Sequence, residues 1–407
     1  MVTVKIPDGY YMQHVKYEMY PNEMQAEFID RCINTSRFVY NWALGFINDW
    51  RVEFLNDADP EIYINEFPGK YTVQREFTKL RNNPDYAFLK DLPHISARNA
   101  VDNACNSISM YKKGICKYPK YKTKKNSKLA YKTRFDTMYF HEDKVKIEGC
   151  SRIDLKINTG KHSTDNIVYY NPTITKDNTG RYWISCGYLS KKKINPIIPN
   201  SEVKKPLGID LNVKKRFVFS NGEVIWEPNA HRLENRYKRA QRRNRKDINR
   251  RLRLEKTNPE SKDCQISKRA RKRELNLSRL SKKLNNVEIN CINQAAAYVI
   301  KQNPAYVVME HLEVKSMMPD KYSGKKLGRA KFYEAKVRIK HKCEQYNIPF
   351  IEADRQFPSS QLCSCCGNRQ HIGKSRKYIC PICGLEIDRD LNAAINLSKY
   401  KVYNSAV

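Results

Sequence analysis

Residues 361–397 read QLCSCCGNRQHIGKSRKYICPICGLEIDRDLNAAINL and begin with two Cys-x-x-Cys pairs. The four cysteines are Cys363, Cys366, Cys380 and Cys383. Four thiolates at these spacings can surround one tetrahedral zinc ion, whereas disulfide bonds would not require the paired arrangement. The stretch therefore predicts a zinc knuckle in which the metal is structural.

Three acidic residues stand at the ends of apolar segments. Asp210 lies in LGIDLN, Glu310 closes YVVME, and Asp390 follows the knuckle in DRDLN. Taken alone, Asp210 is more typical of a turn, Glu310 of a solvated strand end and Asp390 of a helix N-cap. Three carboxylates in one α/β block favour a two-metal hydrolase, because carboxylates hold Mg²⁺ or Mn²⁺ ions about 3.5–4 Å apart. Asp388 is the rival of Asp390, since DRD offers two carboxylates.

The charge balance indicates a polyanionic partner. The 407 residues include 76 Lys and Arg against 43 Asp and Glu, a net charge of +33. Such an excess favours binding to nucleic acid or to an anionic membrane. The sequence has no run of about 18 apolar residues, and its N-terminal segment lacks a hydrophobic signal core. We therefore expect no membrane partner and a location in the cytoplasm or nucleoid. The length predicts two to four domains.

The thirteen cysteines favour a reducing compartment. Five cluster between residues 363 and 383 and the others are scattered, a pattern that argues against a disulfide framework. We expect the scattered cysteines to be small core residues. Cys365 is interpreted as a bystander of the knuckle, because Cys363 and Cys366 keep the two-residue spacing.

The N-terminal half predicts a helical segment inserted into a β domain. Residues 10–20 are typical of a strand, and Asn22 with Gln25 resembles the capping box of a long helix. The run 112–128, KKGICKYPKYKTKKNSK, is basic and Tyr-interleaved, and we interpret it as exposed and facing phosphate. Alternating strands with a hairpin turn at 177–180 follow. The first strand is expected to join this sheet.

A Lys- and Pro-rich linker at 191–206 precedes a block with the order of an RNase H-like layer fold. LGIDLN is a predicted strand, RFVFSNGEVIW a tight hairpin, and AYVVME and IPFIEA buried strands. Helices are expected at about 285–301 and 329–346. A hairpin followed by alternating α and β elements is the order of that fold.

A basic run separates the hairpin from Glu310. Residues 231–284 hold 21 Lys and Arg against six Asp and Glu, and Asn258-Pro259 interrupts them. We expect a helical hairpin that contacts phosphate rather than a solvated helix pair, because like charges at this density repel one another without counter-ions.

These motifs resemble those of the TnpB family, which are transposon-encoded, RNA-guided DNA endonucleases ancestral to the type V CRISPR effectors. GIDLN with its hairpin, VVMEHL, PSSQLCSCCG, CPICG and DRDLNAAINL are similar to the RuvC and zinc-ribbon motifs of the family. The segments YEMYPNEMQAEFIDRCINTSRFVYNWAL and YPKYKTKK agree more loosely with its N-terminal half. The longer, interrupted basic segment at 231–284 departs from the family pattern.

The resemblance implies the site residues and the domains. The catalytic, Mg²⁺-binding acids carry over to Asp210, Glu310 and Asp390, the last because the family places an acid two positions before Asn. The zinc ligands carry over to the four knuckle cysteines. The implied fold is a multidomain α+β architecture with an RNase H-like RuvC nuclease domain, an inserted zinc ribbon, a β-barrel-like wedge domain and a helical recognition domain. The expected boundaries are 1–20 for the first wedge strand, 21–128 for the recognition domain, 129–204 for the wedge β domain, 205–357 for RuvC, 358–386 for the target-nucleic-acid-binding zinc ribbon and 387–407 for the C-terminal part of RuvC.

The resemblance also implies the partners. A guide RNA from the transposon end would pair with double-stranded target DNA, while the protein reads backbone shape and a short target-adjacent motif. One RuvC site with Mg²⁺ or Mn²⁺ would cut both strands in turn, in a chain expected to be a monomer rather than a dimer. The candidate nucleic-acid contacts are Tyr40, Ser96, Arg98, Asn99, Asn103, Lys120, Lys122, Arg242, Arg243 and Arg245.

Three alternatives remain open at this point. A miniature type V CRISPR effector would share the fold and the acids but use a CRISPR RNA. A nucleic-acid-binding relative with an inactive site would share the charge, although three intact acids speak against it. A generic zinc-ribbon transcription protein would leave the GID and VVME strands unexplained.

Overall fold

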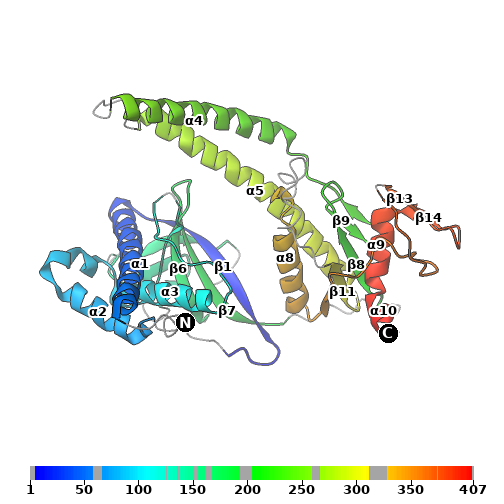
Figure 1. Ribbon diagram of the computed structural model, residues 1–407, viewed down its shortest axis with the longest axis horizontal. Coiled ribbons are helices and arrows are strands. Elements are labelled where there is room, and N and C mark those ends of the chain that lie inside the picture. The colour runs from blue at the N-terminus through cyan, green and yellow to red at the C-terminus, as the bar shows by residue number, and fades with distance from the viewer. Residues whose placement is uncertain are drawn as a thin grey trace. The chain divides into compact units, whose positions relative to one another are not determined.

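The computed structural model describes residues 5–57, 67–124, 126–134, 138–150, 154–160, 167–192, 204–258, 266–310, 328–373 and 375–405. The chain divides into two compact units, Met1–Ser190 and Lys191–Val407 (Figure 1). Most of the predicted linker at 191–206 lies outside the described residues.

One seven-stranded sheet organises the first unit, and β1 (Tyr10–Tyr20) lies in its middle, between β7 and β5. The other strands are β2 (Leu129–Lys132), β3 (Met138–His141), β4 (Lys144–Ile147), β5 (Leu155–Asn158), β6 (Tyr169–Lys176) and β7 (Tyr182–Lys191). Their order across the sheet is β2-β6-β7-β1-β5-β4-β3. The first strand therefore joins the β region, as the sequence predicts.

The helices of this unit are α1 (Glu23–Asp57), α2 (Lys70–Asn82), the 3₁₀ helix η1 (Pro84–Asp91) and α3 (His94–Lys112). Helix α1 packs against α3 and against β2. Buried residues of these helices and of the sheet form one continuous hydrophobic core. The helical insertion is thus packed into the same core as the sheet that it interrupts in sequence.

Two local motifs predicted in this unit are confirmed. Asn22 Oδ1 accepts a hydrogen bond from Gln25 N at 2.9 Å, and Gln25 Oε1 accepts one from Asn22 N at 3.0 Å, which is the reciprocal pattern of a capping box. The turn between β6 and β7 is closed by Asp177 Oδ1, which accepts from Thr179 N at 2.8 Å. Gly180 adopts a φ of +82° there, a conformation open to glycine.

The second unit contains a five-stranded sheet in the order β10-β9-β8-β11-β12. Its strands are β8 (Leu207–Leu211), β9 (Phe217–Phe219), β10 (Val224–Ile225), β11 (Val307–Glu310) and β12 (Phe350–Ala353). Strands β8, β9 and β10 form an antiparallel meander, whereas β11 runs parallel to both β8 and β12. The predicted hairpin and the alternating elements after it are therefore present.

Helices α4 (His231–Thr257) and α5 (Lys268–Gln302) form the expected helical hairpin (Figure 1). The predicted boundary between a basic hairpin ending at residue 284 and a separate helix starting at 285 is wrong, because α5 is continuous. No Gly or Pro lies between residues 268 and 302, so nothing in the backbone interrupts the helix where the charge pattern changes. Helix α8 (Phe332–Gln345) agrees with the prediction.

The remaining elements form the C-terminal part of this unit. They are the two-stranded ribbon β13 (Lys377–Ile379) and β14 (Glu386–Asp388), then α9 (Arg389–Ser398) and α10 (Tyr400–Ser405). Within the described part of the chain every cysteine is free. Most of the scattered cysteines are at least partly buried, but Cys116 is exposed, so the prediction of a core role is wrong for it. Cys264 lies outside the described residues.

Candidate active site and zinc knuckle

Strand register places two of the predicted acids side by side. Because side chains alternate between the two faces of a strand, Gly208 and Asp210 share one face of β8, and Val308 and Glu310 share one face of β11. The strands are parallel, with Val308 paired to Gly208, so that both acids stand at the same, carboxyl-terminal edge of the sheet. This edge is where functional residues gather in open α/β sheets.

Helix α9 supplies the third acid from the same face. Val308 and Leu397 belong to one small core, which places α9 over the face that carries Asp210 and Glu310. Gly208 lets the helix approach closely, because a Cβ at this position would lie only 2.0 Å from Ala394 O. Asp390, in the first turn of α9, is thereby brought to the edge of the sheet.

Asp388 and Asp390 have different surroundings in the structure. Asp388 is the N-cap of α9, and its Oδ1 accepts hydrogen bonds from Asp390 N at 3.1 Å and Leu391 N at 3.2 Å. Its other oxygen lies 2.6 Å from Lys215 Nζ. The capping role that the sequence also allowed for Asp390 therefore belongs to Asp388, and the carboxylate of Asp390 is left to line a cavity with the other two acids.

The three acids share a cavity of about 290 Å³. Its walls come from the turn after β8, from the start of α8, from the segment before the knuckle and from α9. The lining residues are Asp210, Leu211, Asn212, Val213, Glu310, Phe332, Ser359, Ser360, Arg389, Asp390 and Ala393. Ser359, Ser360 and Arg389 lie inside the motifs PSSQLCSCCG and DRDLNAAINL, but no site role was predicted for them from the sequence.

Burial raises the pKa of two of the acids, and the charges of neighbouring carboxylates add to the effect at Asp210. Burial, together with the charges of Glu310 and Asp390, raises the pKa of Asp210 well above its ordinary value. Burial raises the pKa of Glu310 to about 7, against a hydrogen bond with the Leu211 backbone that lowers it. Closely spaced carboxylates that resist ionisation are stabilised by a bound cation, so the donor set fits a hard divalent ion.

A lysine of the chain itself already faces Asp390 and its neighbour Asp388. Lys215 Nζ, on the turn between β8 and β9, lies 2.6 Å from Asp388 Oδ2 and 3.5 Å from Asp390 Oδ2. Arg216 beside it is fully buried and pairs with Glu288 of α5 at 3.3 Å, while its guanidinium also donates to Val213 O at 2.5 Å. Neither residue has a sequence signal beyond its charge, and together they fix the turn that lines the cavity.

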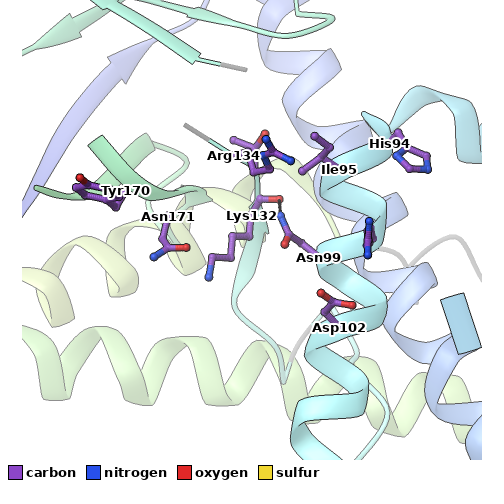
Figure 2. Close-up of a pocket in the computed structure, with 10 residues that line it drawn as sticks. His94, Ile95, Asn99, Asp102, Lys132, Arg134, Tyr170 and Asn171 are labelled. Atoms are coloured by element: carbon purple, nitrogen blue, oxygen red, sulfur yellow. Dashed lines mark hydrogen bonds between the residues drawn. The ribbon is translucent and has the colours of Figure 1, made fainter. Parts of the chain in front are cut away.

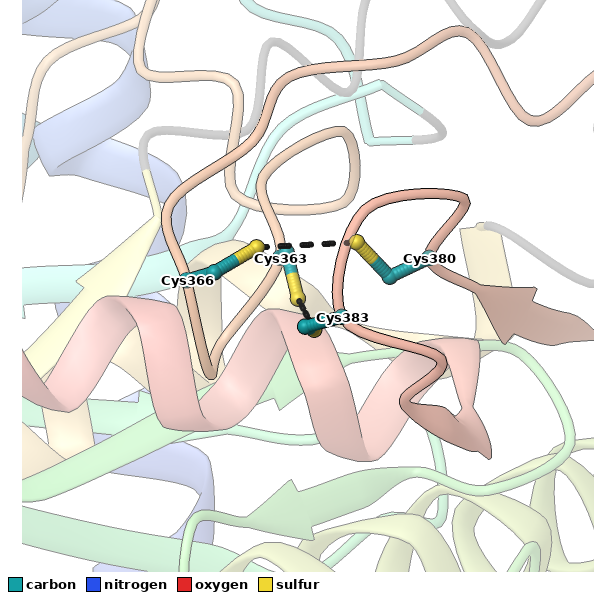
Figure 3. A group of neighbouring side chains, drawn as sticks. All are labelled: Cys363, Cys366, Cys380 and Cys383. Atoms are coloured by element: carbon teal, nitrogen blue, oxygen red, sulfur yellow. Dashed lines mark hydrogen bonds between the residues drawn. The ribbon is translucent and has the colours of Figure 1, made fainter.

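The four predicted knuckle cysteines meet in space (Figure 3). All four sulfur atoms lie within 4.8 Å of one another. The separations Cys363–Cys383 and Cys366–Cys380 are both 3.6 Å. A tetrahedron with Zn–S bonds of about 2.3 Å has edges of about 3.8 Å, so the cluster can hold zinc. Cys365 is exposed and outside the cluster, which confirms that it is a bystander.

The predicted nucleic-acid contacts on α3 differ in how far their side chains are buried. Arg98 is exposed and Asn99 partly buried, and both line a pocket of about 480 Å³ between α3 and the strands β2 and β6 (Figure 2). Lys132, Arg134 and Asn171 line it from the sheet side. Asn103, on the same helix, is partly buried and outside the lining of this pocket.

Other predicted contacts are not free to meet a nucleic acid as the structure places them. Ser96 is fully buried in the helical core, so its inclusion is corrected. Tyr40 is buried as well, and Lys122 Nζ lies 3.4 Å from the centroid of its ring. Asn41 holds the backbone of Lys122 from both sides, accepting from its N at 2.7 Å and donating to its O at 2.9 Å. These two candidates therefore contact each other.

The remaining basic candidates are exposed. Lys120 lies on the surface of the loop after α3, and the arginines of α4, Arg242, Arg243 and Arg245, are exposed as well. Among the described residues no helix is both long and apolar enough to cross a membrane.

Two family models and one curated relative are similar to this chain. The family model "Cas12f1-like, TNB domain" matches residues 332–397, and a "Helix-turn-helix domain" model of the OrfB IS605 type matches residues 12–53. A protein of Streptomyces pristinaespiralis named "Putative RNA-guided DNA endonuclease" is 24% identical over 389 residues, which cover 94% of this chain and 87% of the relative.

Two further matches extend the comparison. "TnpB-like protein L79" of Acanthamoeba polyphaga mimivirus is 33% identical over 75 residues, 18% of this chain and 14% of that protein. The solved "Cas12f1-sgRNA-target DNA complex" matches with a TM-score of 0.52 and 15% identity, covering 94% of this chain and 84% of that one. These matches confirm the resemblance to the TnpB family that the motifs indicate, and the mixed α/β fold resembles that of Cas12f1.

Proposed function

We propose that the chain is an RNA-guided DNA endonuclease that binds a guide RNA derived from a transposon end, recognises a short target-adjacent motif and cuts double-stranded DNA at one RuvC-type site. The observation that carries the proposal is the convergence of Asp210, Glu310 and Asp390 from three separate elements on one cavity. The names of the relatives and the net charge of +33 support the nucleic-acid substrate.

The three carboxylates would hold Mg²⁺ or Mn²⁺. When bound, a pair of such ions supplies an activated water and neutralises charge on the leaving oxygen of the phosphodiester. Asp210 and Glu310 contribute carboxylates whose burial keeps bulk water away and strengthens their hold on a cation. Arg389 also lines the cavity and would supply a positive charge for a phosphate of the DNA strand.

The domain assignment follows from the same proposal. Residues 1–20 and 129–204 act as the wedge domain, 21–128 as the recognition domain and 358–386 as the zinc ribbon. Residues 205–357 and 387–407 act as the RuvC domain. The zinc ion is structural, since the four thiolates leave no open coordination position.

The two nucleic acids are assigned to different basic surfaces. The exposed arginines of α4 bind guide-RNA phosphates, because phosphates neutralise a helix of this charge density. The pocket lined by Arg98, Asn99, Lys132 and Arg134 reads the target-adjacent motif, because it combines fixed donors and acceptors with positive charge (Figure 2). Arg98→Ala should change motif preference in a randomised-target cleavage assay, and Arg31→Ala on α1 is the charge-matched control.

The test of the function is cleavage by the purified RNA–protein complex. The chain is expressed with its genomic flanks, the co-purifying RNA is sequenced, and plasmids matching its guide are incubated with Mg²⁺ or with a chelator. Asp210→Asn should retain RNA and lose cleavage, whereas Asp354→Asn should keep both, since Asp354 follows β12 outside the cavity. Equal failure of wild type and Asp210→Asn to cut would leave only a binding protein, and a repeat-derived RNA would favour a CRISPR effector.

A further inference from the structure

Two buried asparagines of α9 lack a role in the site as described so far. Asn392 and Asn396 are both fully buried in the motif DRDLNAAINL, on the helix that carries Asp390. Asparagine is a poor helix former and its amide is costly to bury without partners. Their presence inside a helix of ten residues therefore requires compensating hydrogen bonds.

Four side-chain hydrogen bonds of these asparagines reach one segment, residues 359–364, which we call the knuckle-entry segment. Asn392 Nδ2 donates to Leu362 O at 2.7 Å, and its Oδ1 accepts from Ser364 N at 2.9 Å. Asn396 Nδ2 donates to Ser359 O at 2.8 Å and to Leu362 O at 2.8 Å. Side chains of α9 thus hydrogen-bond to main-chain N–H and C=O groups that lie outside any named strand or helix.

The knuckle-entry segment belongs to two sites at once. Its first residues, Ser359 and Ser360, line the cavity of the three acids. Cys363, near its end, is a member of the four-cysteine cluster. A shift of this segment therefore moves a wall of the cavity and a zinc ligand together.

We propose that Asn392 and Asn396 are positioning residues of the nuclease site, which tie the knuckle-entry segment to α9 and so fix the Ser359–Ser360 wall against Asp390. The inference rests on the proposed function of the acids. The amides also connect the cysteine cluster to the acid cavity, because zinc bound by the cysteines would restrain one end of the segment that they hold. Divalent-ion affinity at the acids then depends on side chains that do not touch the ion.

The test uses the full chain with guide RNA, loaded with zinc. Asn396→Leu has a similar volume, favours the helix and removes both donors. It should keep one zinc per chain and wild-type RNA affinity. We expect its half-saturating Mn²⁺ concentration, measured by Mn²⁺ electron paramagnetic resonance, to rise at least about tenfold, and cleavage at saturating metal to fall about a hundredfold, the effect of a small misplacement.

A second asparagine variant and a control variant complete the test. Asn392→Leu has a similar volume and removes the donor to Leu362 O and the acceptor for Ser364 N without adding a charge, so it decides the question if Asn396→Leu does not fold. Ser398→Ala is the matched control, because the Ser398 hydroxyl donates within α9 to Ile395 O and does not reach the segment.

The outcomes separate the proposals. Wild-type Mn²⁺ affinity in both asparagine variants, or loss of zinc before any loss of Mn²⁺ affinity, would overturn the positioning role. A wild-type complex that binds Mn²⁺ at the acids but never cuts DNA would overturn the proposed function and leave the positioning result intact.

Discussion

Gly208→Ala is the substitution whose steric effect can be worked out most directly from the structure. The new methyl group would lie 2.0 Å from Ala394 O and 2.5 Å from Ser398 N, whereas ordinary van der Waals contact begins at 3.4 Å. The difference between 3.4 and 2.0 Å requires α9 to move away from β8 by about 1.4 Å. Both clashing atoms are backbone, so a side-chain rotation cannot relieve them.

The consequence should be larger for activity than for folding. Overpacking of this kind costs about 1–3 kcal/mol, less than the total stability of a typical domain. A loss of about 2 kcal/mol lowers the Tm by about 4–8 °C in a unit of this size. Asp390 moves with α9 relative to Asp210 and Glu310, and a misplacement of about 1 Å costs about a hundredfold in rate.

The assay combines thermal denaturation of the zinc-loaded protein with single-turnover plasmid cleavage. Gly45→Ala is the matched control, since Gly45 lies inside α1 and a Cβ there meets only Tyr121 Oη at 3.5 Å. It should leave cleavage unchanged and stabilise the helix by about 0.5–1 kcal/mol. A Gly208→Ala protein with wild-type Tm and wild-type cleavage would refute the close packing of α9 on β8 and the account of how Asp390 is placed.

The remaining predictions concern the acids, the knuckle and the buried ion pair. Asp390→Ala should abolish cleavage and retain RNA binding. Asp388→Ala should lower the free energy of unfolding by about 1 kcal/mol, because a helix cap is lost, and should keep measurable cleavage. The reverse pattern in a cleavage assay would exchange the roles of the two aspartates. Cys380→Ser should lose zinc by elemental analysis and weaken Mn²⁺ binding with it, because a structural zinc site supplies folding free energy; full activity with zinc retained would contradict this. Arg216→Met should destabilise the second unit by about 3–5 kcal/mol, measured by denaturant unfolding, because it leaves Glu288 without its buried partner. An unchanged midpoint of denaturation would show that the ion pair contributes nothing to stability.

The stability of the metal-free protein should depend on pH through Glu310. Burial raises the pKa of Glu310 from 4.5 to about 7, so in the metal-free protein this group stays protonated where the unfolded chain is already ionised. Its contribution to stability is therefore lost as the pH rises from about 4.5 to about 7, and Glu310→Gln should remove that part of the dependence. Metal binding needs the ionised form and should weaken as the pH falls through about 7. Identical Tm–pH curves for wild type and Glu310→Gln would contradict the raised pKa.

Features with a local signal could be predicted from the sequence. The Asn22–Gln25 capping box and the turn at 177–180 depend on a few adjacent residues, and the structure has both. The Cys-x-x-Cys pairs predicted the cysteine cluster because the ligand spacing is itself a geometric constraint. Apolar runs predicted β8 and β11, and parallel pairing then brings their acidic ends together.

Features set by tertiary packing could not be predicted in the same way. Polar residues such as Ser96 suggested a surface, but only the packing of α3 decides which face of that helix is buried. Tyr40 is a predicted nucleic-acid contact, but the side chain of Lys122, 82 positions further along the chain, covers its ring. The choice between Asp388 and Asp390 needed the cap geometry, because either aspartate can begin a helix.

The most direct measurement is anomalous diffraction from Mn²⁺ in crystals of the chain bound to guide RNA and target DNA. We expect a pair of manganese peaks about 3.5–4 Å apart, ligated by carboxylates of Asp210, Glu310 and Asp390. Manganese bound elsewhere, or no peak within bonding distance of these three side chains, would contradict this expectation.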